Sequence, residues 1–425
     1  MLDISLIRSR PEVVKSAMLT KRIGEPDSVD QILELDTANR ELLTRLHNIQ
    51  AEANASAKSI GELMRAGKRD EAQIQIQANA KAKSDIKDLE EESRALADAL
   101  EALMLEVPNV PHESVPVGTS PADNQSVFEW GSAPEFDFPA LPHWDLLEKH
   151  ALADFDRGSK VTGAGFPFYI GKGAKLQRAL VNFFLDSASA AGYTEMQSPL
   201  VVNEDSARGT GQLPDKEDQM YVVTRDELFL IPTAEVPVTN YHRDEVLAED
   251  VLPIMYAAYT PCFRREAGSY GKDVRGLNRL HQFDKVELVK FVHPDDSYDE
   301  LESLREDAES LLQKLELPYR RLLMCTADMG FTQAKKYDLE IYSAAQDRWL
   351  EVSSISNFEA FQSRRSRIRF KAPTGGPTAP VHTLNGSALA LPRIVAGLLE
   401  NNQGADGSIR IPEALVPYTG FESIG

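Results

Sequence analysis

Apolar and small residues follow a heptad pattern in the first quarter of the chain. They recur at alternating steps of three and four over residues 32–63, and again over residues 79–107. This spacing places them along one side of a helix and is typical of a coiled-coil seam. Gly67 separates the two series and prolines follow the second. We therefore predict an antiparallel helical hairpin whose coiled coil covers about residues 28–107.

Charge is unevenly distributed along this hairpin. Residues 56–87 hold seven basic and four acidic residues, a surplus of +3 in a chain whose formal net charge is −20. As the solvated face of a coiled coil this pattern would be ordinary, but a cationic face also suits contact with RNA phosphates. The basic residues are Lys58, Arg65, Lys68, Arg69, Lys81, Lys83 and Lys87.

Further along the chain, helical and strand-like patterns alternate. Residues 108–145 are rich in Pro, Ser and Gly and are predicted to be an extended linker. Residues 173–191 and 295–315 carry apolar stripes at helical spacing, and residues 143–156 are also helix-like. We expect a mobile loop at residues 203–221, and strands at residues 159–171, 319–324, 337–342 and 349–358.

Residues 261–291 are predicted to form a strand, a long loop and a second strand. The first strand alternates Cys262, Arg264 and Glu266 onto one face. One face of the second strand carries Phe283, Lys285, Glu287, Val289 and Phe291. Charge beside an aromatic ring does not fit an apolar core face, because an unpaired buried charge is costly. The loop is cationic and glycine-rich, which suits phosphate binding, with Gly268, Gly271, Gly276, Lys272, Arg275 and Arg279. Taken alone, the stretch also fits a salt-bridged hairpin on the surface.

This stretch resembles motif 2 of the class II aminoacyl-tRNA synthetases. In the form Phe-Arg-x-Glu-Ala-Gly-x-x-Gly-x-Asp-x-x-Gly-Leu it is similar to the seryl-tRNA synthetase family in particular. The helix and strand before Pro199 resemble motif 1. Residues 381–401 resemble motif 3, with a strand reaching Leu384, a turn at Gly386 and a helix bearing Arg393. Asn278 stands where the family often has an apolar residue.

The resemblance implies an α+β architecture. An N-terminal antiparallel coiled-coil hairpin would form a tRNA-binding arm over residues 1–108. A class II catalytic domain, an antiparallel β-sheet flanked by helices, would follow over residues 109–425. Motif 1 forms the dimer interface in the family, so a homodimer is implied, although a core helix and strand fit that segment equally well.

A cluster of basic residues near the C-terminal third has two interpretations. Arg365, Arg367 and Arg369 alternate as they would on one face of a strand. That face either approaches the acceptor end of the tRNA or is an exposed edge, and the sequence favours neither.

Amino-acid activation has a carboxylate attack the α-phosphate of ATP, so it needs positioning and cations rather than a general base. The resemblance assigns Arg264 and Glu266 as catalytic residues, at the α-phosphate and the adenine amino group. Phe283 and Arg393 would sandwich the adenine ring. Mg²⁺, a hard cation that prefers oxygen ligands, would be held by Glu351 and Ser354. The full set of implied ATP contacts is Arg264, Arg265, Glu266, Phe283, Glu351, Val352, Ser353, Ser354 and Arg393.

Serine is small and polar, so its pocket needs acceptors for the ammonium and hydroxyl groups. Glu287 projects from the same strand face as Phe283, and therefore towards the same site. Thr233-Ala234-Glu235, about 30 residues before Arg264, matches the family's serine-binding element. The implied serine contacts are Thr233, Ala234, Glu235, Glu287 and Ser387. A site built to hydrogen-bond a hydroxyl group rejects alanine, because a buried carboxylate would lose its partner.

Composition limits the partners and the compartment. The 425 residues are 42% hydrophobic and 26% charged, which is typical of a soluble protein with room for two domains. The negative net charge argues against a broad nucleic-acid surface, so no DNA partner is expected, while a local basic patch remains possible. The two cysteines form neither a disulfide framework nor zinc-ligand spacing, so no zinc is expected. A signal peptide and a membrane span are also not expected, which favours a cytoplasmic enzyme.

The predicted function is that of a serine–tRNA ligase, which forms seryl-adenylate and pyrophosphate and then charges the 3′ end of tRNA(Ser). Whether tRNA(Sec) is a second substrate stays open. A synthetase-like enzyme that loads a carrier protein is a second hypothesis, against which the basic hairpin argues. A non-catalytic coiled-coil scaffold is a third, against which the charged residues Arg264, Glu287 and Glu351 argue.

Overall fold

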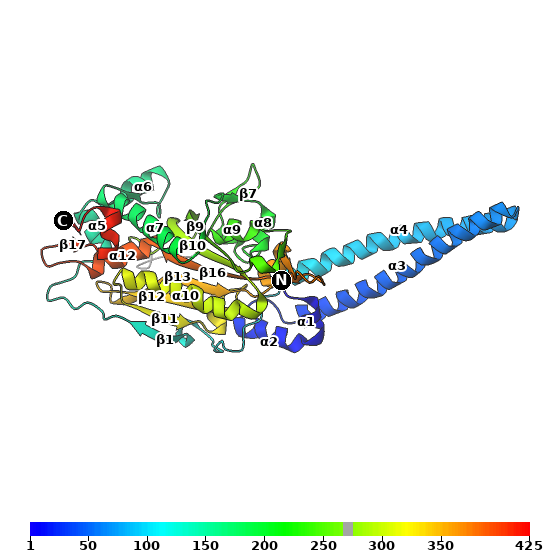
Figure 1. Ribbon diagram of the computed structural model, residues 1–425, viewed down its shortest axis with the longest axis horizontal. Coiled ribbons are helices and arrows are strands. Elements are labelled where there is room, and N and C mark those ends of the chain that lie inside the picture. The colour runs from blue at the N-terminus through cyan, green and yellow to red at the C-terminus, as the bar shows by residue number, and fades with distance from the viewer. Residues whose placement is uncertain (267–274) are drawn as a thin grey trace. The chain divides into compact units, whose positions relative to one another are not determined.

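The computed structural model describes residues 1–266 and 275–425. The predicted loop positions Gly268, Gly271 and Lys272 lie outside the described residues. The described chain forms two compact units (Figure 1). One comprises residues 2–19 and 23–108, and the other comprises residues 109–425 together with Met1 and residues 20–22.

The N-terminal unit is helical. Short helices α1 (Ile4–Ser9) and α2 (Pro11–Lys21) precede two long ones, α3 (Ser28–Arg65) and α4 (Arg69–Glu106). At 1.5 Å per residue, 38 residues make each long helix about 57 Å in length. Leu42, Leu46 and Leu89 form a buried cluster between α3 and α4. The predicted helical hairpin is confirmed.

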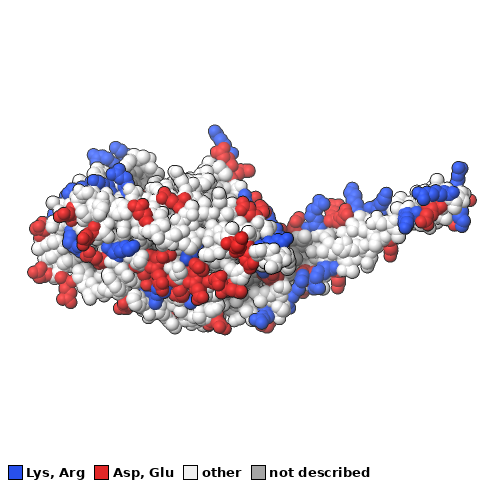
Figure 2. All heavy atoms as spheres, viewed as in Figure 1, with Lys and Arg blue, Asp and Glu red and all other residues white. Residues whose placement is uncertain are grey.

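The basic residues of the hairpin are solvent-exposed. All seven of those between residues 56 and 87 are exposed, and Figure 2 shows Lys and Arg atoms gathered at the end of the hairpin. Alanine, asparagine and serine replace leucine in this part of the seam, where Ala53, Ala72 and Asn79 are the buried residues. The exposed cations therefore belong to the half of the hairpin with the smallest buried side chains.

The larger unit is built on an eight-stranded sheet with the order β1-β11-β12-β13-β16-β10-β9-β4. Neighbouring strands are antiparallel except β4 and β9, which are parallel. This confirms the predicted antiparallel catalytic sheet. The strands are β1 (Gln125–Trp130), β4 (Thr194–Glu195), β9 (Ile254–Phe263), β10 (Gln282–Val292), β11 (Tyr319–Leu323), β12 (Lys335–Ser343), β13 (Arg348–Asn357) and β16 (His382–Ala390).

Three long helices cover one face of this sheet (Figure 1). They are α7 (Lys172–Ala190), α10 (Ser297–Lys314) and α12 (Leu391–Asn401), and their apolar stripes form the main core with the strands. Val286 and Leu288 of β10 point into that core. Because strand side chains alternate, Lys285 and Glu287 lie on the opposite face.

The opposite face is only partly covered by apolar residues. Val289 and Phe291 pack in a smaller cluster with Ala234 and with Val238 of helix α9 (Glu235–Asn240). The polar half of the same strand, from Phe283 to Glu287, borders a cavity instead. This division explains why one face of β10 carries charged residues in one half and only apolar residues in the other.

Short elements complete the larger unit. The helices are α5 (His143–Lys149), α6 (Phe155–Val161), α8 (Glu204–Gly209), α11 (Phe361–Ser366) and α13 (Val416–Thr419). The short strands are β2 (Ala153–Asp154), β3 (Phe168–Tyr169), β5 (Val201–Val202), β6 (Val222–Val223), β7 (Leu228–Leu230), β8 (Val246–Ala248), β14 (Arg369–Lys371), β15 (Ala379–Pro380), β17 (Ile409–Arg410) and β18 (Ser423–Ile424). Over the described ranges, 1–266 and 275–425, no helix is both long and apolar enough to span a bilayer.

Several predicted elements were wrong. The expected linker 108–145 contains β1, an edge strand whose residues are mostly exposed and so carry no apolar alternation. The expected strand 159–171 begins within helix α6. The expected loop 203–221 contains α8, which begins where the Asn203 side chain accepts a hydrogen bond from the Ser206 amide. The helix-like segment 143–156 comprises α5, β2 and the start of α6.

Two site-related predictions also need correction. Arg365, Arg367 and Arg369 do not share a strand face, because α11 ends at Ser366 and Arg367 has a left-handed backbone conformation. Gly386 is not in a turn but within β16, where it pairs with Leu288 and Ile355. A Cβ atom at Gly386 would lie 2.4 Å from Leu304 Cδ2 on α10, so a larger residue there would force the buried Leu304 side chain to move.

We expect Gly386→Ala to lower the free energy of unfolding by about 1–3 kcal/mol, because the added methyl group overpacks a buried contact. Urea denaturation of the variant and the wild type measures this difference. Leu304→Ala in the same background removes the clash, so the double variant should lose less stability than the two single losses added together. Additive losses would show that the Gly386–Leu304 contact is not the constraint.

Candidate active site

The implied ligand-binding residues converge on one cavity of about 680 Å³. It lies at the polar half of β10, between the neighbouring parts of β13, β16 and α12 and the segment before α9. Its lining includes Thr233, Glu235, Arg264, Glu266, Phe283, Glu287, Glu351, Val352, Ser353, Ser354, Ser387 and Arg393. Two implied residues do not line it. Ala234 is fully buried in the smaller apolar cluster that contains Val289 and Phe291. Arg265 is exposed, and its amide donates to the Gln219 carbonyl at 2.9 Å.

One end of the cavity is acidic and buried. Glu287 Oε1 and Glu235 Oε2 both accept from the Asn385 amide, at 3.0 Å and 2.8 Å. Glu287 also forms an ion pair with Lys285, whose ammonium group donates to Thr233 Oγ1 at 2.9 Å. Two carboxylates therefore share one amide, with a single buried ammonium group beside them.

This arrangement makes Glu235 hard to ionise. Burial and the nearby charge of Glu287 raise the pKa of Glu235 from 4.5 to about 7, although the Gln362 amide donates to its carboxylate at 2.6 Å. A cationic group placed between the two carboxylates would favour the ionised form of both. The acidic end is thus suited to a small ligand carrying an ammonium group.

Three residues of this acidic end were missed by sequence reasoning as ligand-site members. Lys285 alternates with Phe283 and Glu287, so the same period-two argument could have found it. Asn385 precedes Ser387 by two residues in β16 and shares its face, but a turn was expected there. Gln362 comes from α11, and no local signal in the sequence connects it to Glu235.

The other end of the cavity carries arginines and an aromatic ring. The Arg264 guanidinium lies 5.2 Å from the centre of the Phe283 ring, and its Nε donates to the Pro232 carbonyl at 3.3 Å. Arg393 Nε donates to the Asn278 carbonyl at 3.1 Å, and its Nη1 donates to the Glu351 carbonyl at 2.7 Å. Backbone oxygens thus fix both guanidinium groups, and both arginines line the cavity.

Glu266 takes part in an ion pair. Its carboxylate accepts a hydrogen bond from Arg279 Nε, 13 residues further along the chain. Glu266 also has a positive φ of 49°, so the backbone turns sharply after the end of β9. The predicted alternation Cys262, Arg264, Glu266 therefore ends with the strand at Phe263.

Oxygen-bearing side chains gather beside Arg393. Ser354 on β13 pairs in register with Asp338 on β12, and Glu351 lies on the same strand as Ser354. Burial raises the pKa of Asp338 to about 7, despite an ion pair with Lys336 at 3.1 Å, and its Oδ1 is buried without a hydrogen-bond partner. Burial opposes ionisation of Glu351, but Lys336 and Arg393 outweigh it and keep the pKa of Glu351 below its ordinary value.

Fold and site together define a class II aminoacyl-tRNA synthetase. Residues 221–402 match the model of the tRNA synthetase class II core domain (G, H, P, S and T). Residues 1–111 match that of the seryl-tRNA synthetase N-terminal domain. The chain belongs to the seryl-tRNA synthetase family, a family of ATP-dependent ligases, which confirms the resemblance seen in the sequence.

Relatives along the whole chain support this membership. The chain is 60% identical to the serine–tRNA ligase of Salinibacter ruber over 425 residues, covering 100% of this chain and 99% of the relative. It is 37% identical to the solved seryl-tRNA synthetase from Pyrococcus horikoshii complexed with ATP, with a TM-score of 0.94 and coverage of 100% and 99%. The solved cytoplasmic serine–tRNA ligase from Naegleria fowleri in complex with AMP is 26% identical, with a TM-score of 0.89 and coverage of 100% and 98%.

We expect Glu235 to contribute stability to the free protein that is lost as the pH rises from about 4.5 to 7, whereas His382, whose burial lowers its pKa to about 4, changes stability in the opposite sense. Glu235 has a raised pKa in the folded state, so the folded protein binds more protons than the unfolded chain in this range. The contribution is complete below pH 4.5 and is lost above pH 7, with a size of roughly 3 kcal/mol. Urea denaturation at pH 4.5, 6 and 8 measures it.

Glu235→Gln should remove this part of the pH dependence. Asp338→Asn is the companion variant, since it removes the other cavity-side carboxylate with a pKa near 7. An unchanged slope in Glu235→Gln would show that Glu235 ionises normally in the folded protein.

Proposed function

We propose that the protein attaches L-serine to tRNA(Ser) in two steps, using ATP to form seryl-adenylate and pyrophosphate first. One observation carries this proposal: a single cavity has an acidic, hydrogen-bonding end beside an end with two oriented arginines. An amino acid and a nucleotide need these two environments side by side. The serine carboxylate is already ionised, so the reaction requires positioning and cations rather than a base.

The nucleotide occupies the arginine end in this proposal. Arg264 contacts the α-phosphate and the carboxylate of serine, and Glu266 accepts from the adenine amino group. Adenine lies between Phe283 and Arg393, because an aromatic face and a guanidinium plane both stack on a flat base. The 5.2 Å approach of Arg264 to the same ring supports a nucleotide phosphate next to the stacked base. Val352 and Ser353, which line the cavity, complete the proposed ATP contacts.

Mg²⁺ is the proposed cation for ATP, held by Glu351 and Ser354. These are hard oxygen donors, and they fit a cation that takes few protein ligands and completes its shell with water and phosphate. Among residues 1–266 and 275–425, no group of three or more His, Cys, Asp or Glu side chains is arranged to hold a metal. When bound, the cation would offset charge on the phosphates.

Serine occupies the acidic end in this proposal. Glu235 and Glu287 face its ammonium and hydroxyl groups, together with Thr233 and Ser387, which also line the cavity. The raised pKa of Glu235 supports this assignment, because a bound ammonium group would relieve the repulsion from Glu287. Lys285 and Asn385 hold the Glu287 carboxylate in place.

The helical hairpin is proposed to bind the long variable arm of tRNA(Ser). We assign residues 1–108 to this tRNA-binding domain and residues 109–425 to the catalytic domain. The exposed cations at the end of the hairpin support it, because they form a local basic patch on a protein of net charge −20.

A homodimer and a cytoplasmic location are also part of the proposal. Exposed apolar side chains, including Ile170, Leu200, Tyr241 and Tyr259, offer surface that a second copy would cover, and Tyr259 lies on β9, next to the edge strand β4. Cys262 and Cys325 are both free thiols, as is usual in a reducing compartment.

We expect Glu287→Ala to abolish serine-dependent pyrophosphate exchange, a loss of about 10³-fold or more, while ATP still binds. The variant removes the acceptor for the ligand and leaves Lys285 unpaired at the acidic end. Exchange kinetics and equilibrium dialysis with ATP measure the two properties separately. Glu287→Gln is the matched control for volume and should lose activity while remaining folded. Unchanged exchange in Glu287→Ala would overturn the pocket assignment.

We expect the tRNA arm to affect charging but not activation. Replacing Lys58, Lys81 and Lys83 with glutamine should reduce aminoacylation of tRNA(Ser) by about tenfold or more, because phosphate contacts are lost. Serine-dependent pyrophosphate exchange should stay at the wild-type rate. Deleting the variable arm from the tRNA should cause a comparable loss with the wild-type enzyme.

The control for this experiment replaces Lys314 and Lys371 of the larger unit with glutamine, which changes charge outside the hairpin. Equal charging of intact and arm-deleted tRNA by the wild-type enzyme would remove the assignment of residues 1–108.

A further inference from the structure

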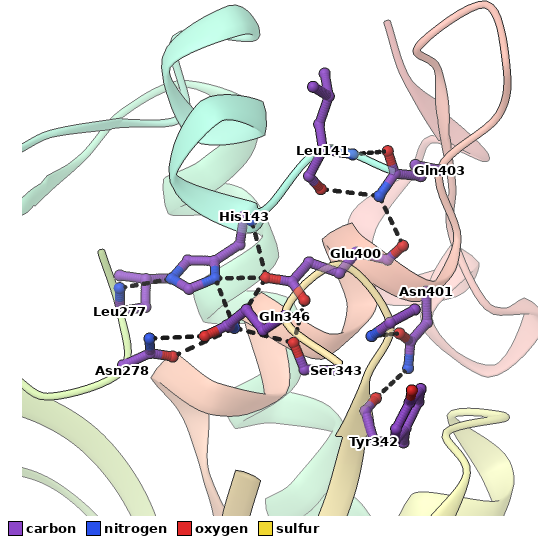
Figure 3. Close-up of polar contacts among 11 residues, drawn as sticks. Leu141, His143, Leu277, Asn278, Tyr342, Ser343, Gln346, Glu400, Asn401 and Gln403 are labelled. Carbon is purple, nitrogen blue, oxygen red and sulfur yellow. Dashed lines mark hydrogen bonds and ion pairs between the residues drawn. The ribbon is translucent and has the colours of Figure 1, made fainter. Parts of the chain in front are cut away.

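A buried polar network connects α5, α12 and the segment at Leu277 and Asn278 (Figure 3). At its centre are His143, the first residue of α5, and Glu400, near the end of α12, and both are 0% exposed. Glu400 Oε1 accepts from the His143 ring nitrogen Nδ1 at 2.7 Å and from the His143 amide at 2.9 Å. Ser343 donates to the other carboxylate oxygen.

The tautomer of the His143 ring follows from its two short contacts, since the third, from Gln346 Nε2 to Nδ1, is longer at 3.4 Å. The Leu277 amide, which can only donate, bonds to His143 Nε2 at 2.9 Å, so this nitrogen must carry the lone pair. Nδ1 therefore carries the hydrogen and donates it to Glu400. Burial opposes ionisation of Glu400, yet hydrogen bonds from His143 and Ser343 outweigh it and keep the pKa of Glu400 below its ordinary value. A neutral imidazole thus connects a buried carboxylate to the backbone of Leu277.

The segment that receives this hydrogen bond also holds a cavity arginine. Leu277 is followed by Asn278, whose carbonyl accepts from Arg393 Nε at 3.1 Å. The Asn278 side-chain amide donates to Gln346 Oε1 at 2.9 Å, and Gln346 in turn donates to Glu400 at 3.0 Å. Arg393 and Glu400 both belong to α12, two helical turns apart. The contacts form a closed ring that starts and ends on α12.

Further contacts attach the same segment to α5. Gly276 has a φ of +64°, and a Cβ atom there would lie 2.4 Å from His143 Nε2, so only glycine allows this approach to the ring. The Arg275 guanidinium lies 4.6 Å from the centre of the Trp144 ring. Leu141, just before α5, exchanges two hydrogen bonds with the Gln403 side chain at 2.8 Å and 2.9 Å. The first turn of α5 is thus fixed to α12 and holds residues 275–277.

We propose that the His143–Glu400 pair positions Arg393 for the nucleotide by holding the backbone of Leu277 and Asn278. His143, Glu400 and Gln346 are positioning residues, since none of them lines the cavity. The closed series of contacts fixes the Asn278 carbonyl. This carbonyl and the Glu351 carbonyl both accept from Arg393, and together they set the orientation of its guanidinium plane. This inference rests on the proposed function in that it assigns the nucleotide to the Arg393 end.

Two substitutions of His143 separate its two hydrogen bonds. In His143→Asn the side-chain amide can replace Nδ1–H as the donor to Glu400, but nothing replaces Nε2 as acceptor for the Leu277 amide. In His143→Gln the longer side chain can place an oxygen near the Nε2 position, but the donor to Glu400 is lost. His143→Asn therefore tests the hydrogen bond from the Leu277 amide. His143→Gln tests what it costs to leave the buried Glu400 carboxylate without its donor at Nδ1.

We expect His143→Asn to raise the KM for ATP in pyrophosphate exchange about tenfold, with the KM for serine changed less than about twofold. His143→Gln should raise the KM for ATP less than His143→Asn does, because it keeps an acceptor for the Leu277 amide, while lowering the Tm more. A purely structural role predicts the opposite, namely that the KM values for both substrates follow the loss of stability. His382→Asn is the matched control, because His382 is a partly buried histidine bonded to Ser297 (2.9 Å) away from the cavity.

Gln346→Leu provides an independent test, since it removes the second link to Asn278 from a partly buried turn position. It should raise the KM for ATP about threefold without changing the KM for serine, even where His143 variants fail to fold. An unchanged KM for ATP in the folded His143→Asn and Gln346→Leu variants would overturn the inference. If the wild-type protein shows no serine-dependent exchange, the proposed function fails, and equilibrium dialysis with ATP still compares nucleotide binding between wild type and variants.

Discussion

The burial of Lys285 and Glu287 on a face of the central sheet is the constraint on which the rest of the site depends. Both side chains are under one-tenth exposed, and a buried charge is costly unless it is paired and hydrogen-bonded. They pair with each other, and Thr233, Asn385 and Ser387 supply further hydrogen bonds. These partners come from the segment before α9 and from β16, so satisfying one ion pair draws three parts of the chain to one place.

The same strand, β10, serves the core and the cavity because its side chains alternate. Val286 and Leu288 pack under α7, α10 and α12, and this apolar layer fixes the height and register of the strand. Gly386 on the neighbouring strand lets α10 approach closely. A rigid sheet carrying polar residues on one face can hold them at fixed separations, which suits a reaction that depends on positioning rather than on a base.

Helix α12 connects the core to the nucleotide end. Its apolar residues lie in the main core, while Arg393 and Glu400 use its two ends for polar contacts. The intervening ring through His143, Leu277 and Asn278 makes the orientation of Arg393 dependent on α5, a helix that precedes it by about 250 residues. The orientation of Arg393 in the cavity thus depends on contacts between residues that do not line the cavity.

The sequence by itself determined the helical hairpin, the two strands of the central motif and twelve of the residues that line the cavity. These follow from periodicity and residue type, and periodicity reflects which side of an element is buried. Tertiary structure alone decided that β1 joins the sheet, that Gly386 lies within a strand and that Arg365, Arg367 and Arg369 share no face. It also decided the partners of Glu235 and Glu400, because Gln362 and His143 are distant in the chain. The physical reason is that a hydrogen bond between distant residues leaves no periodic pattern, since only folding brings its donor and acceptor together.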